Sequence, residues 1–235
     1  RIGHAGTPPD DDGANGIENA GCHTLVRYND IHGNGSVGYY SKMQPEGGQR
    51  TSLKSGSWAR VYHNTIYRNG FGDAVINGDQ FKHGVCIWSY RTYNDWPENV
   101  VVKNNIVYDN DNEWRVGSPN IRPQVTYANN FSRNPRFINP DIADKTSLVL
   151  PDLRLQPGSP CVDAGAPLTR ADGTGTAGVT LVVDDAWPFQ DGSWGSALTH
   201  GQTHFPDAIA VGTADNVAEI AAVDYASRTI TLAAP

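Results

Sequence analysis

A short asparagine pattern occurs four times along the chain and constrains its fold more than any other feature. Each copy begins with Asn, has an apolar residue at the third position and closes with Asn at the sixth. The copies are NDIHGNG from Asn29, NTIYRNG from Asn64, NIVYDND from Asn105 and NNFSRNP from Asn129, spaced 35, 41 and 24 residues apart. The shortest spacing is close to one turn of a parallel β-helix, and the longer two fit one turn with an inserted loop. The pattern therefore predicts a stack of coils.

The residue types in the pattern fit the interior of such a stack. Every second side chain of a strand points to the same face, so the apolar residue and the leading asparagine of each copy should both point inward. A buried amide needs a hydrogen-bond partner, and a stacked asparagine one coil away can supply it. The alternative is that Asn34-Gly35 and Asn69-Gly70 mark hairpin turns, although a hairpin does not need the same offsets four times. We expect apolar stacking of Ile31, Ile66, Val107 and Phe131, and asparagine ladders through Asn29, Asn64, Asn105 and Asn129 and through Asn34, Asn69, Asn110 and Asn134.

Composition agrees with a folded β protein and narrows its partners. Asp supplies 20 of the 25 acidic residues, and 19 asparagines and 25 glycines favour turns over helices. The net charge is −7 and the 18 basic residues are scattered, which argues against a nucleic-acid partner. No apolar run reaches the length of a membrane span. Cys22, Cys86 and Cys161 show no metal-ligand spacing, and we expect buried free thiols.

Two segments resemble a known superfamily. HNTIYRNG and VVKNNIVYDN are similar to coils of the right-handed parallel β-helix, or pectate-lyase-like, superfamily. The stretch from Pro135 to Pro167 resembles the exit segment common in secreted bacterial proteins of this kind, and the resemblance as a whole spans roughly residues 17 to 167. It implies secretion or a cell-surface location, and a groove that binds long polysaccharides, which many members cleave as lyases or glycosidases. In the exit segment, Phe137, Ile138, Leu153 and Leu155 are expected to cover the open end of the stack.

We therefore expect an all-β chain in three parts. Residues 1–16 form a flexible acidic segment, residues 17–167 a short right-handed parallel β-helix with inserted loops and an exit segment, and residues 168–235 a small antiparallel β-barrel or β-roll. In the last part, strand-like runs begin at Thr180, Asp207, Val217 and Arg228.

The sharper catalytic motifs of the superfamily are not intact. The paired carboxylates of the polygalacturonase-like hydrolases are missing from the coils, and the Arg-x-Pro-x-x-Arg of pectate lyases is matched only by Arg133 and Pro135, followed by Ile138. A lyase acting on a uronic acid needs a cation against the carboxylate and a base for the adjacent proton. The insertion FGDAVINGDQFKHG and the following VCIWSYRTYNDW are the richest source of such groups.

The candidate site residues come mainly from this insertion. The candidate base or neutralising groups are Lys82, His83 and Arg91, the candidate calcium ligands Asp73 and Asp79, and the candidate sugar-stacking residues Trp88, Tyr90, Tyr93 and Trp96. A second basic cluster, Lys42, Lys54 and Arg60, could line the same groove against an acidic glycan. The alternative for both groups is an ordinary solvated surface. Asp10, Asp12 and Asn15 resemble part of a calcium loop, and His200 and His204 have metal-ligand spacing, but we expect a flexible tail and a loop without metal there.

Two functions follow as expectations. The first is a secreted protein that binds an acidic polysaccharide, with calcium as the candidate cofactor and with cleavage by β-elimination left open. The second is a non-catalytic structural, adhesin or tail-fibre-like module, whose uncapped N-terminal end would join another copy or further coils.

Overall fold

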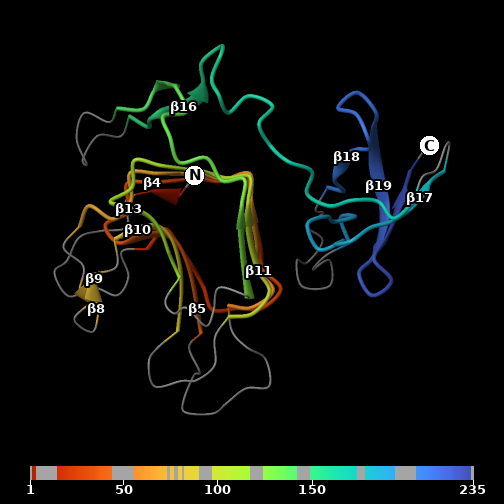
Figure 1. Ribbon diagram of the computed structural model, residues 1–235, viewed down its shortest axis with the longest axis horizontal. Coiled ribbons are helices and arrows are strands. Elements are labelled where there is room, and N and C mark those ends of the chain that lie inside the picture. The colour runs from red at the N-terminus through yellow and green to blue at the C-terminus, as the bar shows by residue number, and fades with distance from the viewer. Residues whose placement is uncertain are drawn as a thin grey trace. The chain divides into compact units, whose positions relative to one another are not determined.

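The computed structural model describes residues 2–3, 15–43, 56–72, 75–76, 79–80, 82–89, 97–116, 124–141, 149–173, 178–193 and 205–233. The chain divides into two compact units, Arg1–Ala166 and Pro167–Pro235 (Figure 1). The described residues form strands, turns and bends but no α-helix, so the chain is all-β there, as predicted. Accordingly, no helix in these ranges has the length and hydrophobicity needed to cross a membrane.

The first unit is built from three sheets of short parallel strands. Sheet A holds β1 (Ile2–Gly3), β4 (Asp30–His32), β7 (Thr65–Tyr67) and β12 (Ile106–Tyr108). Sheet B holds β2 (Ile17–Asn19), β5 (Val37–Met43), β10 (His83–Ser89) and β13 (Asn112–Val116). Sheet C holds β3 (Leu25–Arg27), β6 (Arg60–Tyr62), β11 (Val100–Lys103) and β14 (Val125–Ala128). From β2 onward the chain visits B, C and A in turn, so each circuit is one coil of a parallel β-helix-like stack (Figure 1).

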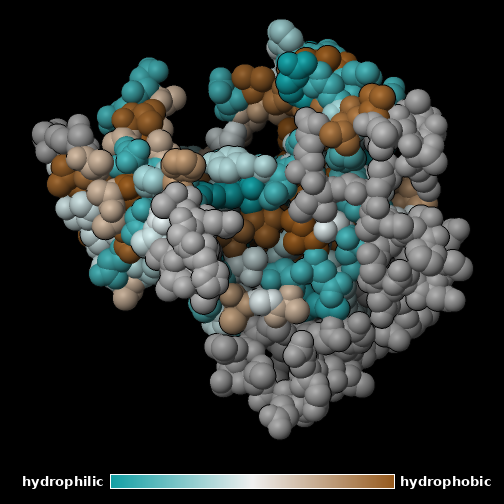
Figure 2. Space-filling model, turned by 180° about the vertical axis from the view of Figure 1, so that it is seen from behind, coloured by the Kyte–Doolittle hydropathy of each residue, from teal (hydrophilic) through white to brown (hydrophobic). Residues whose placement is uncertain are grey.

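The stacked core is the one predicted for the first three copies of the pattern. Ile31 pairs with Ile66 and Ile66 with Val107, and all three side chains are fully buried. Val26, Val61 and Val102 form an equivalent row on sheet C. Seen from behind, hydrophobic residues fill the middle of this unit, with hydrophilic residues above and below them (Figure 2).

Both asparagine ladders are present in the interior. Asn64 donates its side-chain amide to Asn105 Oδ1 at 2.9 Å, and its own Oδ1 accepts the amide of Asn29 at 3.0 Å. At the next corner, Asn34 donates to Asn69 Oδ1 at 2.8 Å, and Asn69 donates to Asn110 Oδ1 at 2.9 Å. Each Oδ1 in these chains also accepts the backbone N–H of the asparagine one coil before it. Backbone carbonyls such as those of Val26 and Ile31 accept from the ladder amides as well, so these buried amides have partners both in the next coil and on the backbone.

The fourth copy of the pattern is shifted by one residue from the prediction. Asn130, not Asn129, continues the first ladder by accepting the Asn105 amide at 2.8 Å. Phe131 accordingly bridges Ile106 instead of stacking on Val107. Asn134 is exposed and accepts the Arg136 N–H, so it does not extend the second ladder. The predicted places of Asn129, Phe131 and Asn134 were therefore wrong.

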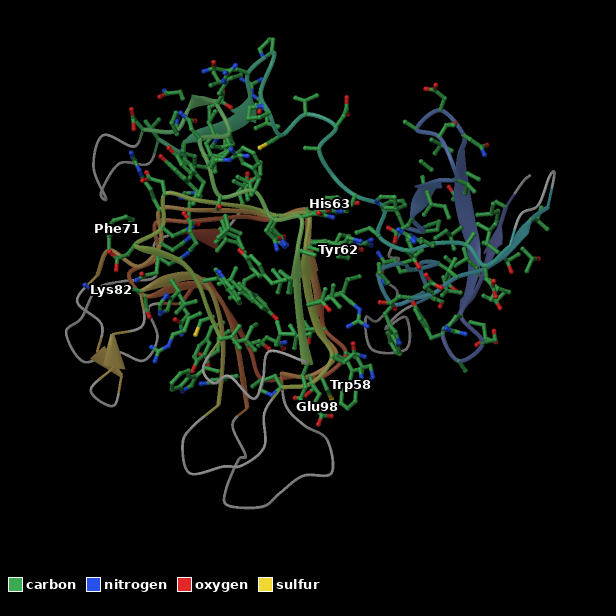
Figure 3. The ribbon with its side chains drawn as sticks, in the orientation of Figure 1. Trp58, Tyr62, His63, Phe71, Lys82 and Glu98 are labelled. Carbon is green, nitrogen blue, oxygen red and sulfur yellow. The ribbon has the colours of Figure 1, made fainter. Side chains whose placement is uncertain are left out.

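The physical reason lies in the corner between sheets C and A. One residue there has left-handed backbone, with φ of 56° at Tyr28, 53° at His63, 55° at Asn104 and 51° at Asn129, and the ladder asparagine follows it. Asn129 fills this left-handed position, which leaves the ladder to Asn130. Figure 3 marks the three corners of the coils: Tyr62 and His63 between C and A, Phe71 and Lys82 between A and B, and Trp58 and Glu98 between B and C.

A row of glycines lets the chain enter sheet B close to the ladder. A Cβ on Gly38 would lie 2.7 Å from the Gly84 carbonyl oxygen, 2.7 Å from Ile66 Cγ2 and 2.9 Å from Asn69 Nδ2. Gly16 and Gly84 are equally crowded one coil away on either side. In the fourth coil, one residue after the His83–Asn112 pair, Glu113 takes the place of this glycine.

The exit segment packs on the side of the stack and does not cover its open end. β15 (Phe137–Asn139) and β16 (Asp152–Leu155) form an antiparallel hairpin that lies beside sheet A (Figure 1). Phe137 and Leu153 are buried with Tyr67, and Leu155 packs against them, whereas Ile138 is 46% exposed. The expectation of an end cap was wrong because Tyr67, Ile106 and Tyr108 on the outside of sheet A are apolar or aromatic and need covering. A second hairpin, β8 (Val75–Ile76) with β9 (Asp79–Gln80), lies in the predicted insertion.

The second unit is a curled antiparallel sheet at the predicted strand positions. It contains β17 (Thr180–Val182), β18 (Ala208–Ala210), β19 (Val217–Asp224) and β20 (Thr229–Leu232), in the order β17-β20-β19-β18. Its own core buries Val183, Ala186, Phe189, Ile220, Ile230 and Leu232.

Candidate functional site

Three predicted site residues lie on the outer face of sheet B. Lys42 and Trp88 are direct neighbours on β5 and β10, whereas His83 lies at the other end of β10, next to Val37. They belong to the face that carries a small cluster of Val37, Tyr40, Cys86 and Trp88, opposite the core. All three are buried, at 7–8% exposure, and Lys42 forms an ion pair with Glu18. Arg115 lies over the Trp88 ring at 4.2 Å, so that ring is already covered on one side.

The chemistry of His83 is set by its burial. Burial, with a smaller effect of Arg115, lowers the pKa of His83 to about 4, so the ring is neutral at pH 7. Neither ring nitrogen has a hydrogen-bond partner among the described residues. Lys82 precedes His83 at the corner between sheets A and B, where its backbone runs against Gly70. Burial also raises the pKa of the neighbouring Cys86 thiol to about 12, so this cysteine is not a thiolate nucleophile at neutral pH.

Each of the remaining predicted residues either lies elsewhere in the coils or has a side chain outside the described residues. Arg60 is on sheet C, where its guanidinium donates to the Asn99 carbonyl at 2.7 Å and so ties two coils together. Asp79 lies in β9, but its side chain is outside the described residues, as are Lys54, Asp73, Tyr90, Arg91, Tyr93 and Trp96 altogether. The same holds for Asp10, Asp12, His200 and His204. In the described part of the chain, no group of three His, Cys, Asp or Glu residues gathers as metal ligands would.

A cleft of about 280 Å³ opens on a different side of the coils, between sheet A and the exit hairpin. All of its lining residues are described. Tyr67, Arg68, Tyr108 and Asp109 come from the coils, and Asn134, Arg136, Phe137, Pro140 and Gln156 come from the exit segment.

The coil side of the cleft is aromatic. Tyr67 and Tyr108 are stacked with ring centroids 6.2 Å apart and planes 17° apart, and Phe137 meets Tyr67 edge-on at 5.5 Å. Tyr67 is buried and burial raises its pKa to about 12, whereas Tyr108 is half-buried. The Tyr108 phenol therefore offers a hydrogen-bonding group on an apolar surface, a combination common in small-molecule sites.

The charged groups of the cleft differ in their partners. Arg68 lies over the Tyr67 ring and pairs with Asp109 at 2.9 Å and with Asp141 at 3.1 Å. Arg136 donates to the Gly158 carbonyl at 3.1 Å and has no carboxylate partner among the described residues. The cleft thus combines an aromatic surface, one arginine paired with two carboxylates and one arginine without a carboxylate partner in the described part of the chain.

Part of this cleft could have been found in the sequence. Tyr67 and Tyr108 occupy the same offset in NTIYRN and NIVYDN, and Arg68 and Asp109 the next one, so correct stacking would have placed each pair together on the outside of the coils. The other wall could not be found, because the exit hairpin was expected at the end of the stack.

Glu113, in the last described coil, is another residue whose pKa is shifted by burial. Burial, and to a lesser extent Asp109, raises its pKa to about 7, against a hydrogen bond with Asn110 that lowers it. Its Oε2 is buried and has no hydrogen-bond partner in the part of the chain that the structure describes. Nearby, Trp114 stacks on Tyr127 with centroids 4.5 Å apart, and burial raises the pKa of the Tyr127 phenol.

Comparison with known proteins adds no family to this description. No protein-family model matches the chain, and neither the curated proteins nor the solved structures that were compared include a match.

Proposed function

We propose that this protein is a right-handed parallel β-helix of the pectate-lyase-like kind that binds acidic polysaccharide outside the cell. The circuit through sheets B, C and A and the ladders at two corners support the fold. The right-handed sense follows the general rule for connections between parallel strands. The extracellular location rests on the sequence resemblance.

The observation that carries the binding function is the cleft between sheet A and the exit hairpin. It offers the half-buried ring of Tyr108, which stacks on the buried Tyr67, the phenol of Tyr108 and the charge of Arg136 in one place. Aromatic faces with neighbouring hydrogen-bonding groups suit sugar rings, which have apolar faces and hydroxyl edges. The outer face of sheet B supports the proposal less, because Lys42 and Trp88 are already engaged by Glu18 and Arg115.

Binding is tested with pectate, alginate, chondroitin and ulvan by affinity electrophoresis of the whole chain. We expect Tyr108→Ala to weaken binding about tenfold because it removes an aromatic contact and a hydrogen bond. Tyr28→Ala is the matched control, because Tyr28 is a 69% exposed tyrosine at another corner of the coils. Thermal melts show whether each variant is folded.

Two outcomes of this experiment have different meanings. Binding that Tyr108→Ala and Tyr28→Ala reduce equally would contradict the cleft as the site. No binding to any glycan would contradict the function and favour the structural module. Absorbance of unsaturated products in the same mixtures tests the predicted β-elimination, in which Lys82, His83 and Arg91 are the candidate groups.

A further inference from the structure

We propose that the cleft on sheet A holds one uronate residue at the end of a glycan chain, and that Arg136 binds its carboxylate. This inference rests on the function proposed above and names the sugar that the same site selects.

The charge of the cleft points to a single carboxylate. Arg68 is paired with two carboxylates, Asp109 and Asp141, which offset its charge. Arg136 uses one N–H for the Gly158 carbonyl and has no carboxylate partner in the described part of the chain. A guanidinium carries five N–H donors in a planar fork, so Arg136 retains an edge that can bind a carboxylate through two hydrogen bonds.

The backbone that carries Arg136 is held in place before any ligand binds. Its N–H donates to Asn134 Oδ1 at 2.8 Å, and its carbonyl accepts the Gln156 N–H at 2.9 Å. Its φ of 57° is a left-handed turn conformation fixed by these two bonds. Because this backbone is already ordered, the protein loses less conformational entropy when a ligand binds, which favours selectivity at this position.

The size of the cleft suits one sugar ring. Its volume of about 280 Å³ lies at the lower end of small-molecule sites. Hydroxyl groups have partners within this space: the Tyr108 phenol, and the amide oxygen of Gln156, whose amide N–H is already donated to the Phe137 carbonyl. An internal residue of a polymer would need the chain to leave the cleft on both sides, whereas a terminal residue needs one exit.

The test is calorimetric titration of the whole chain with matched sugars. The probes are glucuronate and galacturonate, their neutral uronamides, and galacturonate oligomers of increasing length. We expect each uronate to bind at least about tenfold more tightly than its uronamide, as a charge-assisted hydrogen-bond pair provides. The affinity per mole of sugar molecule should not rise from the monomer to the oligomers, because each molecule has one terminal residue that fills the cleft.

Two variants assign the preference to Arg136. Arg136→Gln should bind uronate and uronamide equally, whereas Arg154→Gln, an exposed arginine of the same hairpin that pairs with Asp152 and does not line the cleft, should keep the preference. If Arg136→Gln does not fold, the comparison of uronate with uronamide in the unmodified protein decides.

The failures are distinguishable. Equal binding of uronate and uronamide, a preference that survives in Arg136→Gln, or affinity that rises with oligomer length would overturn the terminal-uronate inference while sugar binding stands. No binding of any sugar or oligomer would overturn the inference together with the proposed function.

Discussion

Asn64 shows how much a single ladder residue contributes. Its amide donates to Asn105 Oδ1 and to the Val26 and Tyr62 carbonyls, and its Oδ1 accepts from Asn29. Asn64→Ala leaves these buried groups without partners, so we expect it to lower the free energy of unfolding by about 2–4 kcal/mol. Urea unfolding of the whole chain measures this loss.

The control for Asn64 is Asn129, which the pattern places in the ladder and the structure places at an exposed left-handed corner. Asn129→Gly keeps that backbone conformation accessible, so we expect a change below about 0.5 kcal/mol. Comparable losses in the two variants would contradict the register described here.

Glu113 is the residue whose protonation should affect stability near neutral pH. Its pKa is raised to about 7 in the folded protein and is near 4.5 in the unfolded chain. Between these values the folded state binds more protons, so stability falls as the pH rises through this window and the penalty is complete above about pH 7. We expect Glu113→Gln to be more stable than the unmodified protein at pH 8 by roughly 1–2 kcal/mol, allowing for solvent screening of a half-exposed group.

The measurement is the urea midpoint of both proteins from about pH 4.5 to pH 8.5. Below the unfolded pKa the two should converge, because both carry a neutral side chain. Parallel curves across the whole range would show that Glu113 does not titrate in this window.

At the scale of the strand, the glycine row is the feature most sensitive to a small change. A methyl group on Gly38 would lie 2.7 Å from the Gly84 carbonyl oxygen, which belongs to a paired strand and cannot move away freely. We expect Gly38→Ala to lower the free energy of unfolding by about 2–4 kcal/mol, because it overpacks the stacked core of the coils and displaces Asn69 of the second ladder. Differential scanning calorimetry should show a lowered Tm.

Gly21→Ala is the control in the same unit. A Cβ added to Gly21 would lie 3.4 Å from Thr24 Oγ1 and 3.5 Å from Asn19 Oδ1, which are ordinary contact distances. The φ of Gly21 is not in the left-handed region. We expect a change within about 0.5 kcal/mol. A similar Tm loss in both variants would mean that chain flexibility, and not the close approach at Gly38, decides the effect.

The strands and the cleft differ in how far the sequence could predict them. Ile31, Ile66 and Val107 share a spacing that comes from the coil itself, so a local repeat was enough to place them. Asn129-Asn130 offered two registers, and only the left-handed corner, a backbone property, selects one. The hairpin of Phe137 and Leu153 depends on which apolar surface is left uncovered, and that follows from the assembled coils. The same limit applies to the cleft, because the repeat predicts the wall formed by the coils but not the wall formed by the exit hairpin.

At the scale of the whole molecule, each unit carries a core of its own. Ile230 is fully buried in the second unit among Val183, Phe189, Ile220 and Leu232, and β20 pairs with both β17 and β19. The first unit is held by its stacked rows and by the two ladders. Because burial and strand pairing are satisfied within each unit, we expect the two to unfold as separate cooperative units.

Ile230→Ala tests this separation. Truncation of a fully buried isoleucine costs about 2–5 kcal/mol, and the loss should appear in the hydrogen-exchange protection of β19 and β20. The amides of Ile66 and Val107 should keep their protection, because their hydrogen bonds lie within the coils. Val61→Ala is the reciprocal variant, with the loss expected in β6, β7 and β11 and not in β19 or β20. If either variant lowered protection in both units by the same amount, the chain would unfold as one cooperative body, and the stability of the coils would depend on the core of the second unit as well.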